Sequence, residues 1–161
     1  MTIAFITHPD CLLHNVGAHH PECPARLQAI EDQLIASGLS DHLQHVEAPL
    51  AGREQLERVH EPAYIAALEA VAPKKGLTHL DPDTAMNPHT LAAALRAAGA
   101  AVLATDKVIQ GGVDAAFCNV RPPGHHAERA RAMGFCLFNN VAVAAAHALE
   151  THAVKRGDIE D

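Results

Sequence analysis

Two adjacent histidines, His125 and His126, follow directly after the turn sequence Arg121-Pro-Pro-Gly124. Neighbouring imidazoles oppose each other's protonation, so we expect one ring to stay neutral near pH 7 and to accept a proton, with the other as its hydrogen-bond partner. Such a pair can act as a general base. The alternative interpretation is a solvated loop pair or a helix-capping device.

Small and aromatic residues that could shape a pocket follow the histidine pair. In the segment MGFCLFNN, residues 133–140, Gly134 would let backbone approach a ligand closely. Phe135 and Phe138 would provide apolar walls. The sequence therefore predicts a pocket with a proton-accepting pair beside an apolar channel.

The elements that must position these residues alternate between strands and helices. The apolar run 115–120 predicts a buried strand, which the two prolines after Arg121 cannot continue, so the histidines lie at the carboxyl end of a strand. Strands are also predicted over 2–7 and 43–46, and helices over 24–38, 54–59, 62–72, 90–110 and 139–152. Residues 11–24 are predicted to form a loop, and Asn87 a helix N-cap. This alternation indicates an α/β fold with a parallel sheet, whose ligands bind beyond the carboxyl ends of the strands.

Composition and charge narrow the classes of function. The chain has 161 residues, of which 48% are hydrophobic, and its formal charge is −7 with its 13 histidines neutral. This composition suits one folded domain, and the negative charge argues against nucleic acid or a membrane surface as a partner. The N-terminus lacks a signal-peptide pattern and the four cysteines lack paired spacing, so we expect a cytoplasmic protein without a disulfide framework.

Four ordered segments resemble one enzyme family. The sequence RPPGHHA at 121–127, followed by MGFCLFNNVAVAA at 133–145, resembles the paired-histidine signature of the zinc-dependent histone deacetylase superfamily, particularly its class II-like bacterial and acetylpolyamine amidohydrolase-like members. Segments 20–26 (HPECPAR), 59–64 (VHEPAY) and 80–84 (LDPDT) resemble further family segments in the family's order. The resemblance implies an arginase/deacetylase-like α/β fold, a parallel sheet flanked by helices, in partial or truncated form, with residues 1–161 as a single incomplete domain.

The resemblance also assigns roles to residues. His125 matches the histidine that hydrogen-bonds a zinc-bound water, and His126 the main general base and acid. Gly134 matches the glycine whose carbonyl receives the scissile amide N–H, and Phe135 a wall of the acyl-lysine channel. The implied reaction is zinc-dependent hydrolysis of an N-acetyl amide of lysine or a polyamine, which releases an amine and acetate.

Two further residues match the family, but for them an ordinary structural role is a stronger alternative than it is for the histidine pair. Asp81 is placed like the rim aspartate that grips the substrate backbone, and Arg26 like the arginine near the inner pocket where acetate leaves. An Asp-Pro-Asp turn and an arginine at a helix start are also common surface features.

The metal ligands that the resemblance implies have no counterpart in this sequence. They are an Asp-x-His after the next strand and a later Asp, followed by a transition-state tyrosine, whereas residues 155–161 read KRGDIED and are too polar for a central parallel strand. We therefore expect no metal ligands in this chain, no zinc bound by it alone and no activity of the isolated chain. An exposed sheet edge is expected to promote association with itself or with a complementary C-terminal fragment.

Two other classes of function stay open at this stage. One is a non-catalytic interaction or oligomerisation partner of an intact homologue. The other is a small zinc-binding module built from the N-terminal histidines and cysteines, namely His8, Cys11, His14, His19, His20 and Cys23. Their spacing fits no common zinc-finger pattern, and for His14 and His19 we prefer a place at the rim of the pocket.

Overall fold

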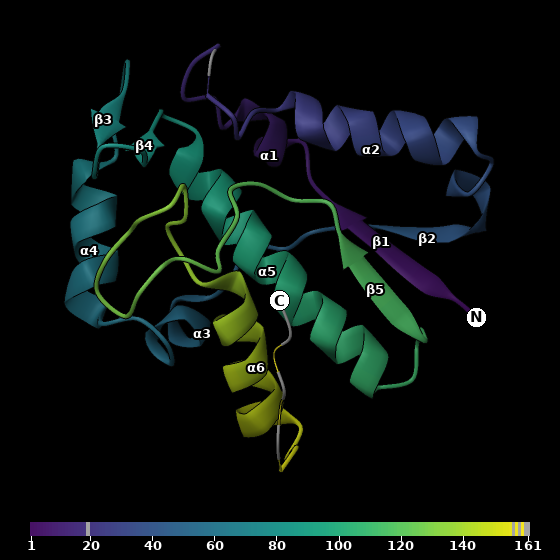
Figure 1. The fold of residues 1–161 in the computed structure, drawn as a ribbon. Coiled ribbons are helices and arrows are strands. Elements are labelled where there is room, and N and C mark those ends of the chain that lie inside the picture. Colours follow the sequence, from purple (N-terminus) through teal and green to yellow (C-terminus); the bar gives the residue numbers. More distant parts are fainter. Residues whose placement is uncertain (19, 156, 158, 160–161) are drawn as a thin grey trace.

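A three-stranded parallel sheet forms the centre of the computed structural model, which describes residues 1–18, 20–155, 157 and 159 (Figure 1). Strand β1 (Ile3–Thr7) lies between β2 (Leu43–Glu47) and β5 (Ala115–Cys118). Ile3 is in register with Leu43 on one side and with Ala115 on the other. The predicted parallel α/β sheet is thus confirmed, and β5 lies at its edge within the described part of the chain.

The strand β1 is apolar along its length because both faces of the sheet are covered. Ala4 and Ile6 pack with Ala100 of helix α5 (Thr90–Ile109) on one face. Phe5 points to the opposite face, where its ring lies 6.0 Å from that of Phe117. Burial on both faces explains a continuous apolar run in place of an alternating one.

Helix α5 lies between the sheet and three other helices, α3 (Arg53–Glu57), α4 (Pro62–Val71) and α6 (Asn140–Thr151) (Figure 1). Its small buried residues let neighbouring backbone approach closely: a Cβ added to Gly99 would lie 2.1 Å from the Pro49 carbonyl oxygen, and the Ala51 N–H donates to Leu95 O of the helix at 2.9 Å. The other helices are α1 (Asp10–Leu13), α2 (Ala25–Ala36), η1 (Ser40–His42), α3 (Arg53–Glu57), α4 (Pro62–Val71) and α6 (Asn140–Thr151). A second core, which includes Leu56, Ile65 and Phe138, fills the space between α3, α4, α5 and α6.

Several predicted bounds are shifted. The segment expected to be a loop after Cys11 begins with the short helix α1, and the antiparallel pair β3 (Thr78–His79) and β4 (Ala85–Met86) was not predicted. Asn87 does not cap α5 directly. Its side-chain oxygen accepts from His89 N and Thr90 Oγ1, each at 3.0 Å, in the turn before the helix.

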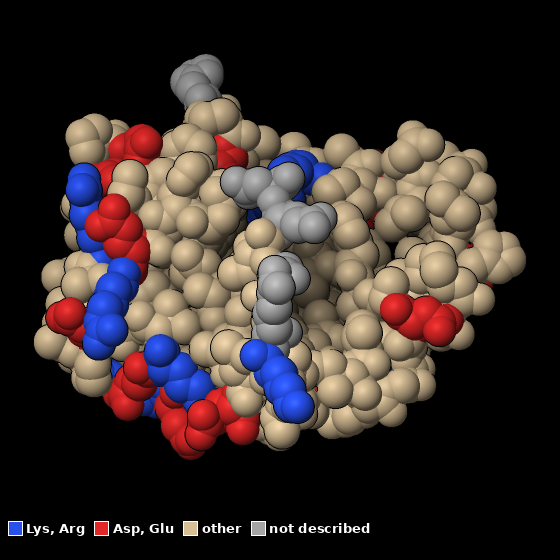
Figure 2. Space-filling view, turned by 60° about the horizontal axis from the view of Figure 1, so that its bottom comes forward, with Lys and Arg blue, Asp and Glu red and all other residues tan. Residues whose placement is uncertain are grey.

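Residues 155, 157 and 159 of the terminal segment are not in a strand, as expected, while 156, 158 and 160–161 lie outside the described residues. In the part of the chain described, no helix has the length and apolar character needed to cross a membrane. Charged side chains gather over α3 and α4, where Arg53 pairs with Glu57 and Glu69, and the middle of the face shown in Figure 2 is largely uncharged.

Candidate functional site

The histidine pair lies in the loop that joins β5 to α6. The rings of His125 and His126 have centroids 4.2 Å apart with their planes tilted by 54°, and both residues are exposed. The structure therefore brings the two predicted imidazoles together at the carboxyl end of β5. An exposed pair in contact is able to exchange a proton with a bound ligand or water.

Arg121 fixes the beginning of this loop from inside the protein. Its guanidinium is fully buried, and it donates through Nε to Glu22 Oε1 at 2.7 Å and through Nη2 to Glu22 Oε2 at 2.5 Å. Nη1 donates to the carbonyl oxygens of Cys11 and His14 at 3.1 and 2.6 Å. A buried cation thus ties the histidine loop to the segment 11–22, with the charge compensated by one bidentate carboxylate.

Asn139 fixes the other end of the loop at the start of α6. Its side-chain oxygen accepts from Ala142 N at 3.0 Å, which makes it the N-cap of α6, and its Nδ2 donates to Ala127 O at 3.1 Å. Its backbone N–H donates to His60 Nε2 at 2.9 Å, so the Nδ1 of this buried histidine carries the proton and donates to Arg129 O at 3.3 Å. Burial lowers the pKa of His60, which keeps the ring neutral for this role.

Gly134 packs directly against the second histidine. A Cβ at Gly134 would lie 2.7 Å from Cδ2 of His126, and its φ of +57° favours glycine. The carbonyl of Gly134, predicted to receive a substrate N–H, accepts from the Cys136 thiol at 3.2 Å. Burial raises the pKa of Cys136, so that thiol keeps its proton. Gly134 and His126 therefore form one surface.

The loop that carries Asp81 is attached to Phe135. Phe135 N donates to Thr84 Oγ1 at 3.0 Å, and Thr84 N donates to Asp81 Oδ1 at 2.6 Å. Partial burial raises the pKa of Asp81, but hydrogen bonds from Asp83 and Thr84 outweigh it and hold the pKa below its ordinary value. The ring of His20 meets that of Phe135 edge-on at 4.6 Å, so the half-buried Phe135 links three segments.

Arg26 reaches the same end of β5 from α2. Its Nη2 donates to Val120 O at 2.9 Å and to Glu22 Oε1 at 3.2 Å. Arg26 and His125 line one cleft of about 550 Å³ between β5 and α6, whereas Asp81 lines another, of about 360 Å³, with Tyr64. The structure thus places Arg26 and His125 on one cleft, and connects Asp81 to the pair through Thr84, Phe135 and Gly134.

The described residues place no group of three metal-ligating side chains beside the histidine pair. The one such group that they contain is Asp106, His147 and His152, which lies between α5 and the far end of α6. His147 lies seven positions after Asn140 on α6, a rise of about 10 Å.

The N-terminal histidines and cysteines do not assemble into a module among the residues described. Cys11 is buried, His20 contacts Phe135, and His14 accepts or donates at 2.7 Å to Thr90 Oγ1. The preferred rim position of His14 is wrong: the residue is 2% exposed, and burial lowers its pKa to about 4. His19 lies outside the described residues.

One pocket residue was misassigned and three supporting residues were missed. Phe138 is fully buried in the core behind the loop and lines no wall of the pocket, because only Phe135 takes the left-handed turn at φ +69°. Arg121, His60 and Asn139 hold the loop, a role that was not predicted for them from the sequence. Their signal was that each lies inside or beside one of the four family-like segments.

Comparisons with known proteins agree on one family. A sequence model described as the histone deacetylase domain matches residues 20–159. The polyamine deacetylase HDAC10 of Homo sapiens is 38% identical over 165 residues, which cover 97% of this chain and 25% of that protein. The histone deacetylase-like amidohydrolase of Pseudomonas aeruginosa is 35% identical, over 98% of this chain and 46% of that protein.

A solved structure gives the same result for the fold. The crystal structure of the HDA15 HD domain matches with a TM-score of 0.86 at 35% identity, and the match covers 91% of this chain and 42% of that chain. The present chain thus spans about a quarter of the length of the HDAC10 proteins, and less than half of that solved domain.

Proposed function

The chain belongs to the histone deacetylase family, and from this membership we propose that residues 1–161 supply the proton-transferring and channel-lining part of a site that hydrolyses N-acetyl amides. The observation that carries the proposal is the contact between His125 and His126, with Gly134 packed on the second ring. The roles of Phe135, Asp81 and Arg26 in this site belong to the same proposal.

The histidines would move the proton that amide hydrolysis requires. The two rings lie in contact, with centroids 4.2 Å apart, and one imidazole of the pair would accept the proton of the attacking water. The C–N bond of the tetrahedral intermediate then breaks, and the proton passes to the leaving nitrogen. The products are an amine and acetate, and the pair returns to its first state.

The substrate that we propose is an acetylated lysine side chain or an acetylated polyamine. A formal charge of −7 attracts a cationic chain, and the ionised Asp81 lies in the loop attached to Phe135. The HDAC10 relatives are named as polyamine deacetylases. These features support a long, positively charged substrate with an uncharged acyl end.

Zinc is the metal that the family implies, and when bound it would polarise the acetamide carbonyl and acidify a water. The described residues do not fit that role, because no three ligating side chains gather beside His125 and His126. We therefore propose that the 161 residues alone do not sustain turnover.

The edge of β5 supports association with further polypeptide. Within the described residues β5 pairs with β1 alone, and Phe117 on this strand is 49% exposed. An unpaired edge beside the cleft can accept another strand from a second copy or from a C-terminal fragment. Light scattering after size-exclusion chromatography is expected to show species larger than a monomer, and a clean monomer would contradict this part of the proposal.

A fusion protein tests the main proposal. The matched segment of the Pseudomonas aeruginosa amidohydrolase is replaced by residues 1–161, and release of acetate is followed with an acetyl-lysine peptide and with an acetylated polyamine. We expect turnover of one or both by the fusion and none by the 161-residue chain alone. Sustained turnover by the chain alone, or a folded fusion inactive on both substrates, would overturn the proposal.

A further inference from the structure

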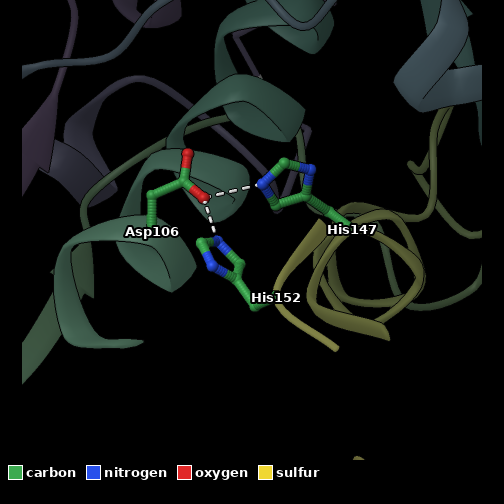
Figure 3. A group of neighbouring side chains, drawn as sticks. All are labelled: Asp106, His147 and His152. Atoms are coloured by element: carbon green, nitrogen blue, oxygen red, sulfur yellow. Dashed lines mark hydrogen bonds and ion pairs between the residues drawn. The ribbon is translucent and has the colours of Figure 1, made fainter. Parts of the chain in front are cut away.

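A cluster of metal-ligating side chains joins α5 to the end of α6, away from the histidine pair. Asp106 comes from α5, His147 from α6, and His152 from the residue directly after α6 (Figure 3). His147 Nε2 lies 2.7 Å and His152 Nε2 2.6 Å from the same oxygen, Asp106 Oδ1. The ligand atoms of all three lie within 4.8 Å of one another.

We propose that Asp106, His147 and His152 form a binding site for one divalent transition-metal ion of the zinc class, separate from the deacetylation chemistry. Two imidazole nitrogens and one carboxylate oxygen are a donor set that Zn²⁺ and its neighbours favour, with a fourth position left for water. The side chains are largely shielded, with exposed fractions of 8% for His147, 12% for His152 and 29% for Asp106. The carboxylate side is thus the open side, through which an ion enters.

The two nitrogen-to-oxygen distances need only a small adjustment to hold an ion. Tetrahedral bonds of about 2.0–2.1 Å hold ligand atoms about 3.3 Å apart, so an ion would lengthen the Nε2–Oδ1 distances of 2.7 and 2.6 Å by roughly 0.6–0.7 Å. The two imidazole rings are nearly perpendicular, at 80° with centroids 5.5 Å apart, and so do not block each other. The ion then replaces the two N–H···O hydrogen bonds that join the helices.

The neighbours of His147 determine which of its two ring nitrogens carries the proton. Without an ion, Arg58 Nη1 donates to His147 Nδ1 at 3.3 Å, which leaves the ring proton on Nε2, facing Asp106. When Nε2 binds a metal, the proton moves to Nδ1 and donates to Thr151 Oγ1, which is 3.3 Å away. Arg58 keeps its ion pair with Glu54 at 3.2 Å.

The helix ends also favour a cation here. His152 is the C-cap of α6, and the free carbonyl groups at a helix C-terminus carry partial negative charge. A metal ion at this point would join the last turn of α6 to α5, the helix with which it shares the most extensive packing. Since about 10 Å of α6 lies between Asn140 and His147, we expect the ion to stabilise the helix pair without touching His125 or His126.

Metal titration of the full 161-residue chain tests the proposal. The protein is stripped with a chelator and titrated with Zn²⁺ in competition with a chromogenic chelator. We expect the protein to bind about one equivalent of Zn²⁺ and to have a higher Tm when the ion is bound. In His152→Gln and in Asp106→Asn the affinity for Zn²⁺ is expected to fall at least ~10-fold, because loss of even an outer-sphere partner of a metal ligand weakens binding by that much or more. His42→Gln, an exposed histidine of η1, is the matched control and is expected to bind as the parent does.

Three further measurements separate this site from the histidine pair and from misfolding. The double variant His125→Gln/His126→Gln is expected to retain the ion, and loss of the ion there would assign it to the pair and overturn the proposal. On the unaltered protein, Co²⁺ is expected to give visible absorption of a low-coordinate site, and Zn²⁺ to shift the imidazole NMR signals of His147 and His152. No bound equivalent, or binding without change in those signals, would overturn the proposal whatever the variants do.

Discussion

The buried pair between Glu22 and Arg121 provides the sharpest test of how the histidine loop is held. In Glu22→Gln, one side-chain oxygen is kept but the charge opposite a fully buried guanidinium is lost. Arg26 also donates to Glu22, so two cations lose their common partner. Removing one member of a buried ion pair costs about 3–5 kcal/mol, and because an acceptor remains we expect about 3 kcal/mol.

Urea unfolding followed by circular dichroism measures this change as the free energy of unfolding in water. The m-value is expected to stay constant, because the same surface is exposed on unfolding. The control is Glu54→Gln, which removes an exposed carboxylate (88% side-chain exposure) paired with Arg58, and the expected change is below about 1 kcal/mol. A loss below ~1 kcal/mol in Glu22→Gln at constant m-value would refute the conclusion that this pair anchors the loop.

Three further predictions concern the same loop and its neighbours. His14 has a pKa of about 4 in the folded protein and 6.5 when unfolded, so its contribution to stability is complete above pH 6.5 and is lost as the pH falls toward 4. At 1.4 kcal/mol per pH unit the loss is about 3 kcal/mol. His14→Gln is expected to remove this part of the pH dependence of the free energy of unfolding, and an unchanged pH dependence would contradict the prediction. Asn139→Ala is expected to lose about 1 kcal/mol of stability through the missing N-cap. Asn139→Asp keeps the N-cap acceptor but loses the donor to Ala127 O, so it is expected to be more stable than Asn139→Ala and less stable than the parent in the same assay. Gly134→Ala puts a methyl group 2.7 Å from the His126 ring and is expected to lower kcat of the fusion at least ~10-fold. The control is Gly111→Ala, because Gly111 has a φ of +75° but open space around it. Equal losses of kcat in the two variants would show that backbone strain alone is responsible.

The elements nearest the histidine pair could be predicted from the sequence because their local signals agree. The apolar run of β1, the prolines after β5, and the long alanine-rich α5 have bounds close to those predicted. The pair could be placed at a strand's carboxyl end for the same reason, since Pro122 and Pro123 stop the strand just before it.

What the sequence could not provide depends on contacts between distant residues. Arg121 is buried only because Glu22, 99 positions earlier, reaches it, and an arginine in a proline turn would otherwise be expected on the surface. Phe135 and Phe138 lie three residues apart in one apolar segment, but Phe135 has a positive φ and is half-buried at the loop, whereas Phe138 is a core residue. The cluster of Asp106, His147 and His152 was not predicted either, because the two histidines contact Asp106 only when α6 packs on α5.

The kcat of the fusion protein with His125→Ala or His126→Ala, relative to the unaltered fusion and to its His42→Gln variant, tests the central claim most directly. If the contacting imidazoles transfer the proton during amide hydrolysis, His126→Ala lowers kcat by about 10²–10⁴-fold, while His42→Gln leaves it unchanged. A folded His125→Ala/His126→Ala fusion that keeps kcat within ~3-fold of the parent, well short of a general-base contribution, would contradict the assignment of the pair.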